Sequence, residues 1–174
     1  LLGTHASNVV NIDKGDVGIA WAEGEVSTVL TLRASYQTSQ AGDVDIYCSD
    51  GLTITTLIQT GGTVRLASNT TLITMDGGDL ILEGSSAHAA LNCSDGIVRY
   101  RSTGTMTAGT IRGEILFNEV NLARTVTNIT LQANAGLDDR FETVVFTNAI
   151  ILQGADIEDL RYLRLGVGIN ILPS

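Results

Sequence analysis

The chain has 174 residues, and 19 acidic residues against 10 lysines and arginines give it a formal net charge of −9. This balance argues against nucleic acid as a partner, because phosphate contacts need a basic surface, and no apolar run approaches the ~18 residues of a membrane helix. Nineteen glycines, one proline and few aromatic residues favour strands and tight turns over helices. The missing start methionine and signal-peptide pattern predict that the chain is the C-terminal part of a longer protein.

A motif of one glycine followed by alternating apolar residues recurs along the chain. It begins at Gly62, Gly78, Gly96 and Gly113, at spacings of 16, 18 and 17 residues, and a further copy is expected at 42–46. The second and fourth residues after each glycine are apolar, which predicts a strand with one face inward. The predicted inward pairs are Val64/Leu66, Leu80/Leu82, Val98/Tyr100 and Ile115/Phe117.

A second strand is expected before each glycine turn, at residues 55–58, 70–73 and 89–92, with a degenerate copy near 105–107. Further along the chain, two Thr-Asn dipeptides, at 127–128 and 147–148, each lead into an apolar strand, at 129–131 and 149–152. A leucine marks each of the first three strands, five or six positions before the glycine. These leucines are Leu57, Leu72 and Leu91.

One unit of two strands and two turns is too small to bury its own apolar face, whereas stacked units bury a continuous core. We therefore predict an all-β chain that forms a parallel β-solenoid with coils of about 17–20 residues. The alternative is an up-and-down antiparallel barrel, which does not require equivalent strands to carry equivalent patterns. Left-handed hexapeptide repeats are absent, so a right-handed β-helix is preferred.

We expect a single domain over residues 1–174 whose ends are capped, because a stack of strands exposes unpaired edges at its ends. The first coil or cap is assigned to 1–45, regular coils to 46–155 and closing strands to 156–174. Acidic residues would keep the last end charged. They are Asp156, Glu158 and Asp159.

The tetrapeptide Cys-Ser-Asp-Gly occurs twice, at 48–51 and 93–96, and raises the question of a disulfide. The two copies are out of phase with the repeat and enter different strands, so Cys48 and Cys93 should lie on different sides of the coil and be unpaired. Without a CxxC motif or paired histidines, a metal site is not expected either. Ser-Asp-Gly is predicted to be a turn that the chain uses twice.

Few residues suggest catalysis. Paired carboxylates serve polysaccharide-degrading β-helices, and the candidate pairs are Asp43/Asp45, on one face of a strand, and Asp138/Asp139, in a loop. Solvated turn carboxylates are far commoner than catalytic ones. The histidines His5 and His88 are isolated, and we expect His88 to be exposed in a turn of small residues. We predict no enzymatic activity and no cofactor.

Two other motifs fall short of a binding site. Residues 77–79, Gly-Gly-Asp, resemble the start of a calcium-binding β-roll repeat but lack the rest of it. Thr-x-Thr at 53–55 and 105–107 has the form found on ice-binding solenoid faces. These pairs do not recur in register in each coil of the predicted repeat, so ordinary β-propensity is the preferred interpretation.

The outward side of the glycine strands carries apolar residues where water would favour polar ones. Three of them are bordered by arginines, which predicts a partner surface, and a subunit interface with threefold symmetry is favoured. A terminal segment folded over the face is the alternative. The predicted interface residues are Arg65, Ile81, Ile97, Arg99 and Leu116.

Four segments, "LLGTHASNVVNIDKGDVGIA" (1–20), "TTLIQTGGTV" (55–64), "ARTVTN" (123–128) and "RLGVGINILPS" (164–174), resemble β-solenoid proteins of tailed phages, with relatives in planctomycete-like bacterial genomes. The resemblance spans nearly the whole chain and implies a virion surface protein. It carries no catalytic residues.

The expected function is a structural protein that decorates and reinforces a phage capsid. It would act as a homo-oligomer, with a trimer favoured, in contact with the major capsid protein or another virion protein at the virion surface. A tail fibre or adhesin module that binds a host receptor or glycan is the alternative. A polysaccharide-degrading β-helix is the second alternative.

Overall fold

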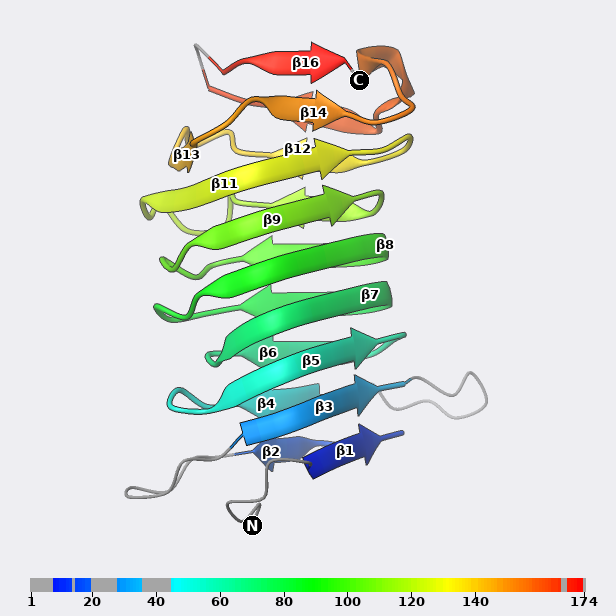
Figure 1. Cartoon of the computed structure of the whole chain (residues 1–174), viewed down its shortest axis with the longest axis vertical. Coiled ribbons are helices and arrows are strands. Elements are labelled where there is room, and N and C mark those ends of the chain that lie inside the picture. The colour runs from blue at the N-terminus through cyan, green and yellow to red at the C-terminus, as the bar shows by residue number, and fades with distance from the viewer. Residues whose placement is uncertain (1–7, 14, 20–27, 36–44, 167–168, 174) are drawn as a thin grey trace.

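The computed structural model describes residues 8–13, 15–19, 28–35, 45–166 and 169–173. The strands of these residues are parallel and stack in one column from the N-terminal to the C-terminal end (Figure 1). The nearer strands in Figure 1 point right, the farther ones point left, and the chain climbs from β1 to β16. The protein is therefore a right-handed β-solenoid, and the predicted fold class is confirmed.

Two sets of strands form the two broad faces of the solenoid, and the long strands β7 and β8 contribute to both because they run through the bend between the faces. The first set, the threonine strands, contains β1 (Asn8–Ile12), β3 (Thr28–Ala34), β5 (Thr53–Gln59), the first part of β7 (Asn69–Leu82), the first part of β8 (His88–Tyr100), β9 (Met106–Ile111), β11 (Arg124–Leu131), β13 (Val144–Phe146), β14 (Ile150–Leu152) and β16 (Ile171–Pro173). The second set, the glycine strands, contains β2 (Val17–Ile19), β4 (Asp45–Cys48), β6 (Thr63–Leu66), the rest of β7 and β8, β10 (Glu114–Leu116), β12 (Gly136–Asp138) and β15 (Tyr162–Arg164). A short 3-10 helix, η1 (Ile157–Asp159), precedes β15.

The core is a set of apolar columns that run the length of the solenoid. Val64, Leu80, Val98 and Ile115 are paired in successive coils and are fully buried. The second members of the predicted inward pairs, such as Tyr100, are also buried. Alternation after each glycine therefore identified the inward face of the glycine strands correctly.

The sequence alignment of the threonine strands was wrong by one residue in β7. Leu57 pairs with Ile73, which is fully buried, whereas Leu72 pairs with Thr56 and is only half-buried. Leu72 and Ile73 are adjacent and both apolar, so composition alone does not tell which one faces inward. A slip of one residue turns a strand over, and packing of Ile73 beneath Leu91 fixes the register.

The predicted copy of the glycine motif at 42–46 is displaced by two residues. Ile46 pairs with Val64, where the motif places it opposite Leu66. A shift of two residues preserves the inward direction, so Ile46 is still buried. Coil length also varies more than predicted, because the coil from Thr28 to its partner Thr53 is much longer than the next one, from Thr53 to Asn69.

Glycines at the turn between the two faces stack on one another. Gly78 and Gly96 have φ values of 91° and 92°, a region that L side chains rarely adopt. A Cβ on Gly78 would lie 2.4 Å from the carbonyl oxygen of Gly62, one coil below. The glycines recur because the coils approach too closely here for any side chain.

The two Cys-Ser-Asp-Gly copies occupy different columns, as predicted. Cys48 pairs with Leu66 on the glycine strands, while Cys93 lies between Met75 and Ile111 on the threonine strands. Both thiols are buried and free. In each copy the aspartate Oδ1 accepts a hydrogen bond from the next glycine N–H at 2.8 Å, so the motif is one turn used twice.

Candidate interaction surfaces

The predicted interface residues lie together on the outward side of the glycine strands. Arg65, Ile81, Arg99 and Leu116 pair in successive coils and form one column, and Ile97 lies in the neighbouring column. Ile81 is only 5% exposed, so it offers little surface to a partner. The other four residues are exposed or half-buried. Whether they contact a partner remains a prediction.

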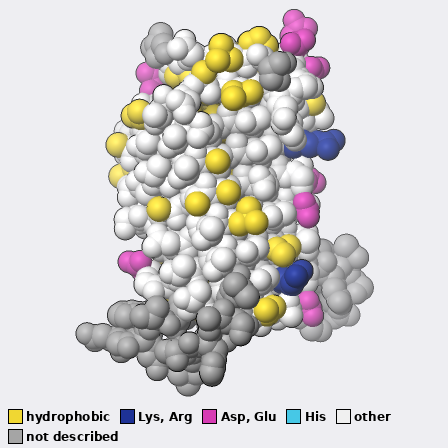
Figure 2. Space-filling model, in the orientation of Figure 1, with side chains coloured by type: hydrophobic (Ala, Val, Ile, Leu, Met, Phe, Trp, Pro, Cys, Tyr) yellow, Lys and Arg dark blue, Asp and Glu magenta, His cyan; other side chains and the backbone are white. Residues whose placement is uncertain are grey.

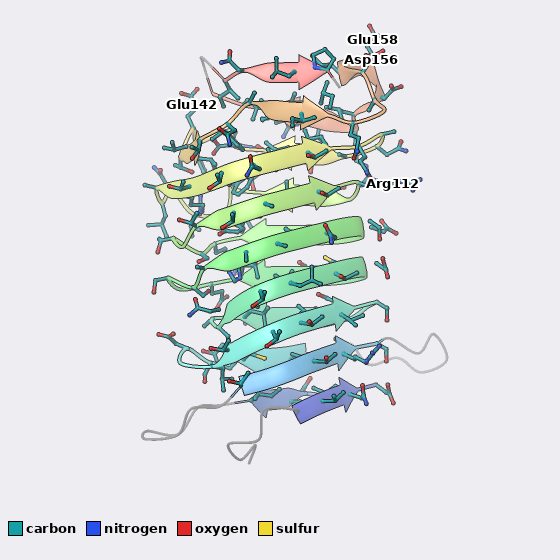
Figure 3. All side chains as sticks on the ribbon, in the orientation of Figure 1. Arg112, Glu142, Asp156 and Glu158 are labelled. Carbon is teal, nitrogen blue, oxygen red and sulfur yellow. The ribbon has the colours of Figure 1, made fainter. Side chains whose placement is uncertain are left out.

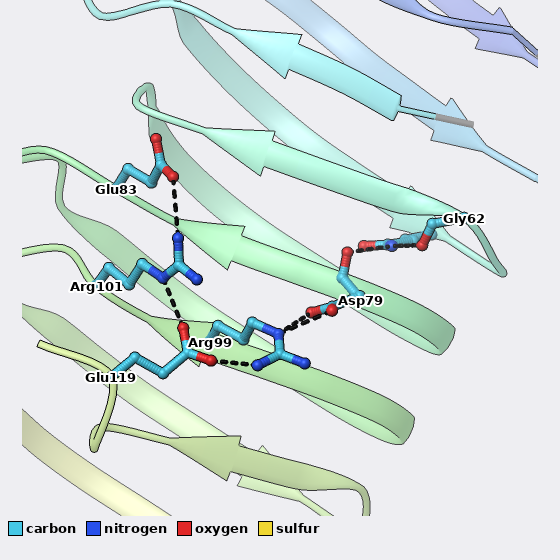
Figure 4. A network of polar contacts seen from close by, with 7 residues as sticks. Gly62, Asp79, Glu83, Arg99, Arg101 and Glu119 are labelled. Carbon is cyan, nitrogen blue, oxygen red and sulfur yellow. Dashed lines mark hydrogen bonds and ion pairs between the residues drawn. The ribbon is translucent and has the colours of Figure 1, made fainter. Parts of the chain in front are cut away.

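Ion pairs within the chain occupy much of this face (Figure 4). The Arg99 guanidinium donates to both carboxylate oxygens of Asp79, at 2.9 and 2.8 Å, and also to Glu119. Arg101 donates to the other oxygen of Glu119 at 2.6 Å and lies 3.7 Å from Glu83. Burial alone would raise the pKa of Glu119, but the hydrogen bonds from Arg101 and Arg99 outweigh it and lower the pKa. The apolar flank expected from sequence is thus interleaved with a charged ladder.

The same columns continue into a second charged cluster near the C-terminal end. Asp138 accepts hydrogen bonds from Arg140, Arg164 and Asn118. The hydrogen bond from Arg140 holds the pKa of Asp138 below its ordinary value. These bonds join three consecutive coils and the loop after β12.

Asp139, the other member of the predicted carboxylate pair Asp138/Asp139, is also held by hydrogen bonds within the chain. It is fully buried and accepts hydrogen bonds from the backbone N–H groups of Thr143 and Val144. A buried, ionised Asp138 beside Arg140 is unsuited to donate a proton, so Asp138/Asp139 gives no support to a hydrolytic site. Asp43 and the side chain of Asp45 lie outside the described residues.

Sequence analysis did not single out Arg124, a buried arginine in β11. Its Nη1 donates to the Phe117 carbonyl and to Thr143 Oγ1, each at 3.0 Å, and its Nη2 donates to the Val120 carbonyl at 2.8 Å. Asp139 supplies the nearby negative charge. Arg124 therefore fastens the loop after β10 to the coil above it, which is a structural role.

The expected exposure of His88 was wrong. His88 is fully buried in the column between Thr70 and Met106. Its Nδ1 lies 2.7 Å from Thr70 Oγ1 and its Nε2 lies 3.3 Å from Ser86 Oγ. Burial lowers its pKa to about 4, so the ring is neutral at pH 7. His5 lies outside the described residues.

The calcium-like motif at 77–79 is used for another purpose, because its only carboxylate, Asp79, is paired with Arg99. Within the described residues, no group of three or more His, Cys, Asp or Glu side chains could hold a metal ion.

The opposite face differs in character. Four outward columns of the threonine strands pass through β5 at Thr53, Thr55, Thr56 and Ile58 and continue in register from coil to coil up to β11. In the next coil they contain Val145 in β13, Thr147 and Asn148 between β13 and β14, and Ile151 in β14. One coil below β5, the fourth column contains the exposed Arg33, which pairs with Ile58. We call this surface the threonine face.

From β5 to β14 none of the four columns of the threonine face contains a charged residue, and Arg33 lies at the lower end of the fourth column. Figure 2, which views this face, shows acidic and basic side chains at its margins. Figure 3 places Arg112 at one edge and Glu142 at the other, with Asp156 and Glu158 near the C-terminal corner. In a chain of net charge −9, this is a strong segregation of charge.

As expected from sequence, the Thr-x-Thr pair does not recur in every coil, because Asn69 replaces its first threonine in β7 and Ala89 replaces its second in β8. Single threonines nevertheless align along this face. One column contains Thr55, Thr71, Thr107, Thr127 and Thr147, interrupted by Ala89. The alignment was missed because coil length changes from one coil to the next, so a fixed period places the threonines out of phase.

Comparison with models of protein families, with curated proteins and with solved structures found no match to this chain. In the part of the chain that the structure describes, no helix has the length and apolar character needed to cross a membrane.

Proposed function

We propose that the protein is a non-enzymatic structural element, a rigid solenoid that stands on a phage capsid and reinforces it. The observation that carries the structural role is the continuous parallel ladder from β1 to β16. The assignment to a phage shell comes from the sequence resemblance alone.

The interior supports a role in which the protein must keep its shape. Most internal strands are hydrogen-bonded on both sides by the coils above and below, and apolar columns fill the space between the faces. Stacked units of this kind form a stiff rod because every coil contacts its neighbours along its whole length. The aromatic rings of His88, Tyr100, Phe117 and Phe146 form a continuous series inside the rod.

Of the two carboxylate pairs predicted from sequence, the one whose side chains the structure describes, Asp138/Asp139, does not favour the hydrolytic alternative. Asp138 is held by arginines and Asp139 by backbone N–H groups, so neither is poised to transfer a proton. The tail-fibre alternative involves the same fold, and it differs from capsid decoration in the number of copies on a particle.

The test is quantitative mass spectrometry of particles produced by the genome that encodes the chain. Capsid decoration predicts hundreds of copies per particle, and removal of the gene should lower the temperature at which the shell opens. A few dozen copies or fewer would move the protein to the tail. Absence from purified particles would overturn the proposal.

A further inference from the structure

The threonine face is a large surface that nothing described so far uses. Its middle consists of short side chains, with Ala89 and Ala90 in β8 and Thr107 and Ala108 in β9. Larger apolar residues, Ile58, Leu72 and Ile151, lie around them. Asparagines bond along the face, as where Asn148 Nδ2 donates to Asn128 Oδ1 at 2.8 Å. Such a mixture, apolar and uncharged polar, is typical of the central part of a protein interface.

Charge decides which partner suits this face. A strongly basic or acidic partner would be met by complementary charges, and from β5 to β14 this face has none. A second copy of the chain also carries a net charge of −9, so two copies repel each other across surfaces that bear carboxylates. Across the threonine face they meet without repulsion, and without burying an ion away from water.

The size of the face is sufficient for a weak dimer. Six rungs at ~4.8 Å and a width of about five residues at ~3.3 Å give a flat area of roughly 500 Å² on each copy. Two copies would bury about 1,000 Å² in total, which is the lower bound for a specific interface. Two such sheets can pack face to face at ~10 Å, as in a β-sandwich.

We propose that the threonine face is the surface on which a second copy of this chain docks, face to face, to form a two-fold dimer. A face that pairs with itself makes an isologous contact, which closes at two copies rather than at the three expected from sequence. An ice surface would require the same groups in every coil, whereas Leu72, Ala90 and Asn128 replace one another along one column. The inference goes beyond the structural role and holds with or without a phage shell.

The buried cysteines make a clean cross-linking test possible. Burial raises the pKa of Cys48 to about 12 and that of Cys93 to about 11, so neither thiol should react in the folded protein. A single engineered cysteine on the surface is then the only reactive thiol among the described residues. We would make Ala108→Cys near the centre of the threonine face and Tyr47→Cys on the glycine-strand face, which is also exposed.

The experiment measures native mass by sedimentation velocity over a range of concentrations, and disulfide cross-linking of both variants under mild oxidation. We expect a monomer–dimer equilibrium for the unmodified chain and rapid cross-linking of Ala108→Cys only. A charge at the same position, Ala108→Glu, should raise the dimer dissociation constant about tenfold or more. The two introduced carboxylates would face each other across the interface, where water is excluded. The matched control, Tyr47→Glu, should leave it unchanged.

Several results would overturn the inference. One is an unmodified chain that stays monomeric at every concentration. Another is a dimer that is dissociated by Tyr47→Glu but not by Ala108→Glu, which would move the contact to the face predicted from sequence. A monomer that separates the freezing and melting points of ice would reassign the threonine face to ice. Because all measurements use the isolated chain, their outcome is separate from the particle test of the proposed function.

Discussion

In the interior of the solenoid, Nδ1 of His88 lies 2.7 Å from Oγ1 of Thr70, one coil below it. The ring is fully buried and stands edge-on to Tyr100, with 5.9 Å between ring centroids. The hydrogen bond replaces water for both groups, so a histidine can occupy a column of apolar residues as long as it stays neutral.

This arrangement makes stability depend on pH below neutrality. The folded protein holds the pKa of His88 at about 4, against about 6.5 in an unfolded chain, so only the unfolded state takes up a proton between these values. Stability is therefore lost as pH falls from about 6.5 to 4, by about 3 kcal/mol in total, and is fully present above pH 7. Urea unfolding at pH 7.5, 5.5 and 4.5 measures this.

Carboxylates also lose their charge at acidic pH, so the measurement needs a variant without the imidazole. In His88→Asn the side chain keeps hydrogen-bonding groups but cannot titrate. Its stability should be lower than that of the unmodified chain at pH 7.5, and the gap should narrow at pH 4.5. Unfolding curves that shift in parallel for both proteins would show that His88 does not contribute.

Glycine at the stacked turn is expected to be irreplaceable. Gly78→Ala places a Cβ 2.4 Å from the Gly62 carbonyl oxygen at a φ of 91°, so both contact and backbone strain oppose it. We expect a loss of about 3 kcal/mol or more in the free energy of unfolding. Gly18→Ala is the control, since its Cβ would meet nothing within 4 Å and its φ is not positive. Equal effects of the two substitutions would contradict the account.

The charged ladder on the glycine strands should contribute modestly and depend on salt. Glu119 bridges Arg99 and Arg101, and its side chain is 20% exposed. Glu119→Gln should cost about 1 kcal/mol at low ionic strength and less in 1 M salt, because partly exposed ion pairs are screened. Glu158→Gln, on the exposed 3-10 helix, serves as the control and should have no measurable effect. A cost that does not change with salt would point to packing instead.

The sequence predicted the fold because the glycine motif carries two independent signals. One is the glycine itself, which a close turn requires, and the other is the alternation of apolar residues, which sets the inward face. It could not predict the environment of His88, because small neighbours such as Ser86 and Ala87 suit a surface turn and a crowded interior equally well. The threonine face was missed for another reason. Its columns form only when coils of unequal length are aligned by backbone hydrogen bonds, which no fixed period reproduces.

The adjacent residues Leu72 and Ile73 test the register directly. Ile73 is fully buried beneath Leu91, so Ile73→Ala should leave a cavity and lower the free energy of unfolding by about 3 kcal/mol. Leu72 lies on the threonine face and is only half-buried, so Leu72→Ala should cost about 1 kcal/mol or less in the monomer. The reverse order would mean that β7 is turned over, with Leu72 aligned with Leu57 as the sequence alone suggested. Because the two substitutions remove similar numbers of atoms from neighbouring positions of one strand, the difference between them measures the direction of the side chains rather than the strand's propensity.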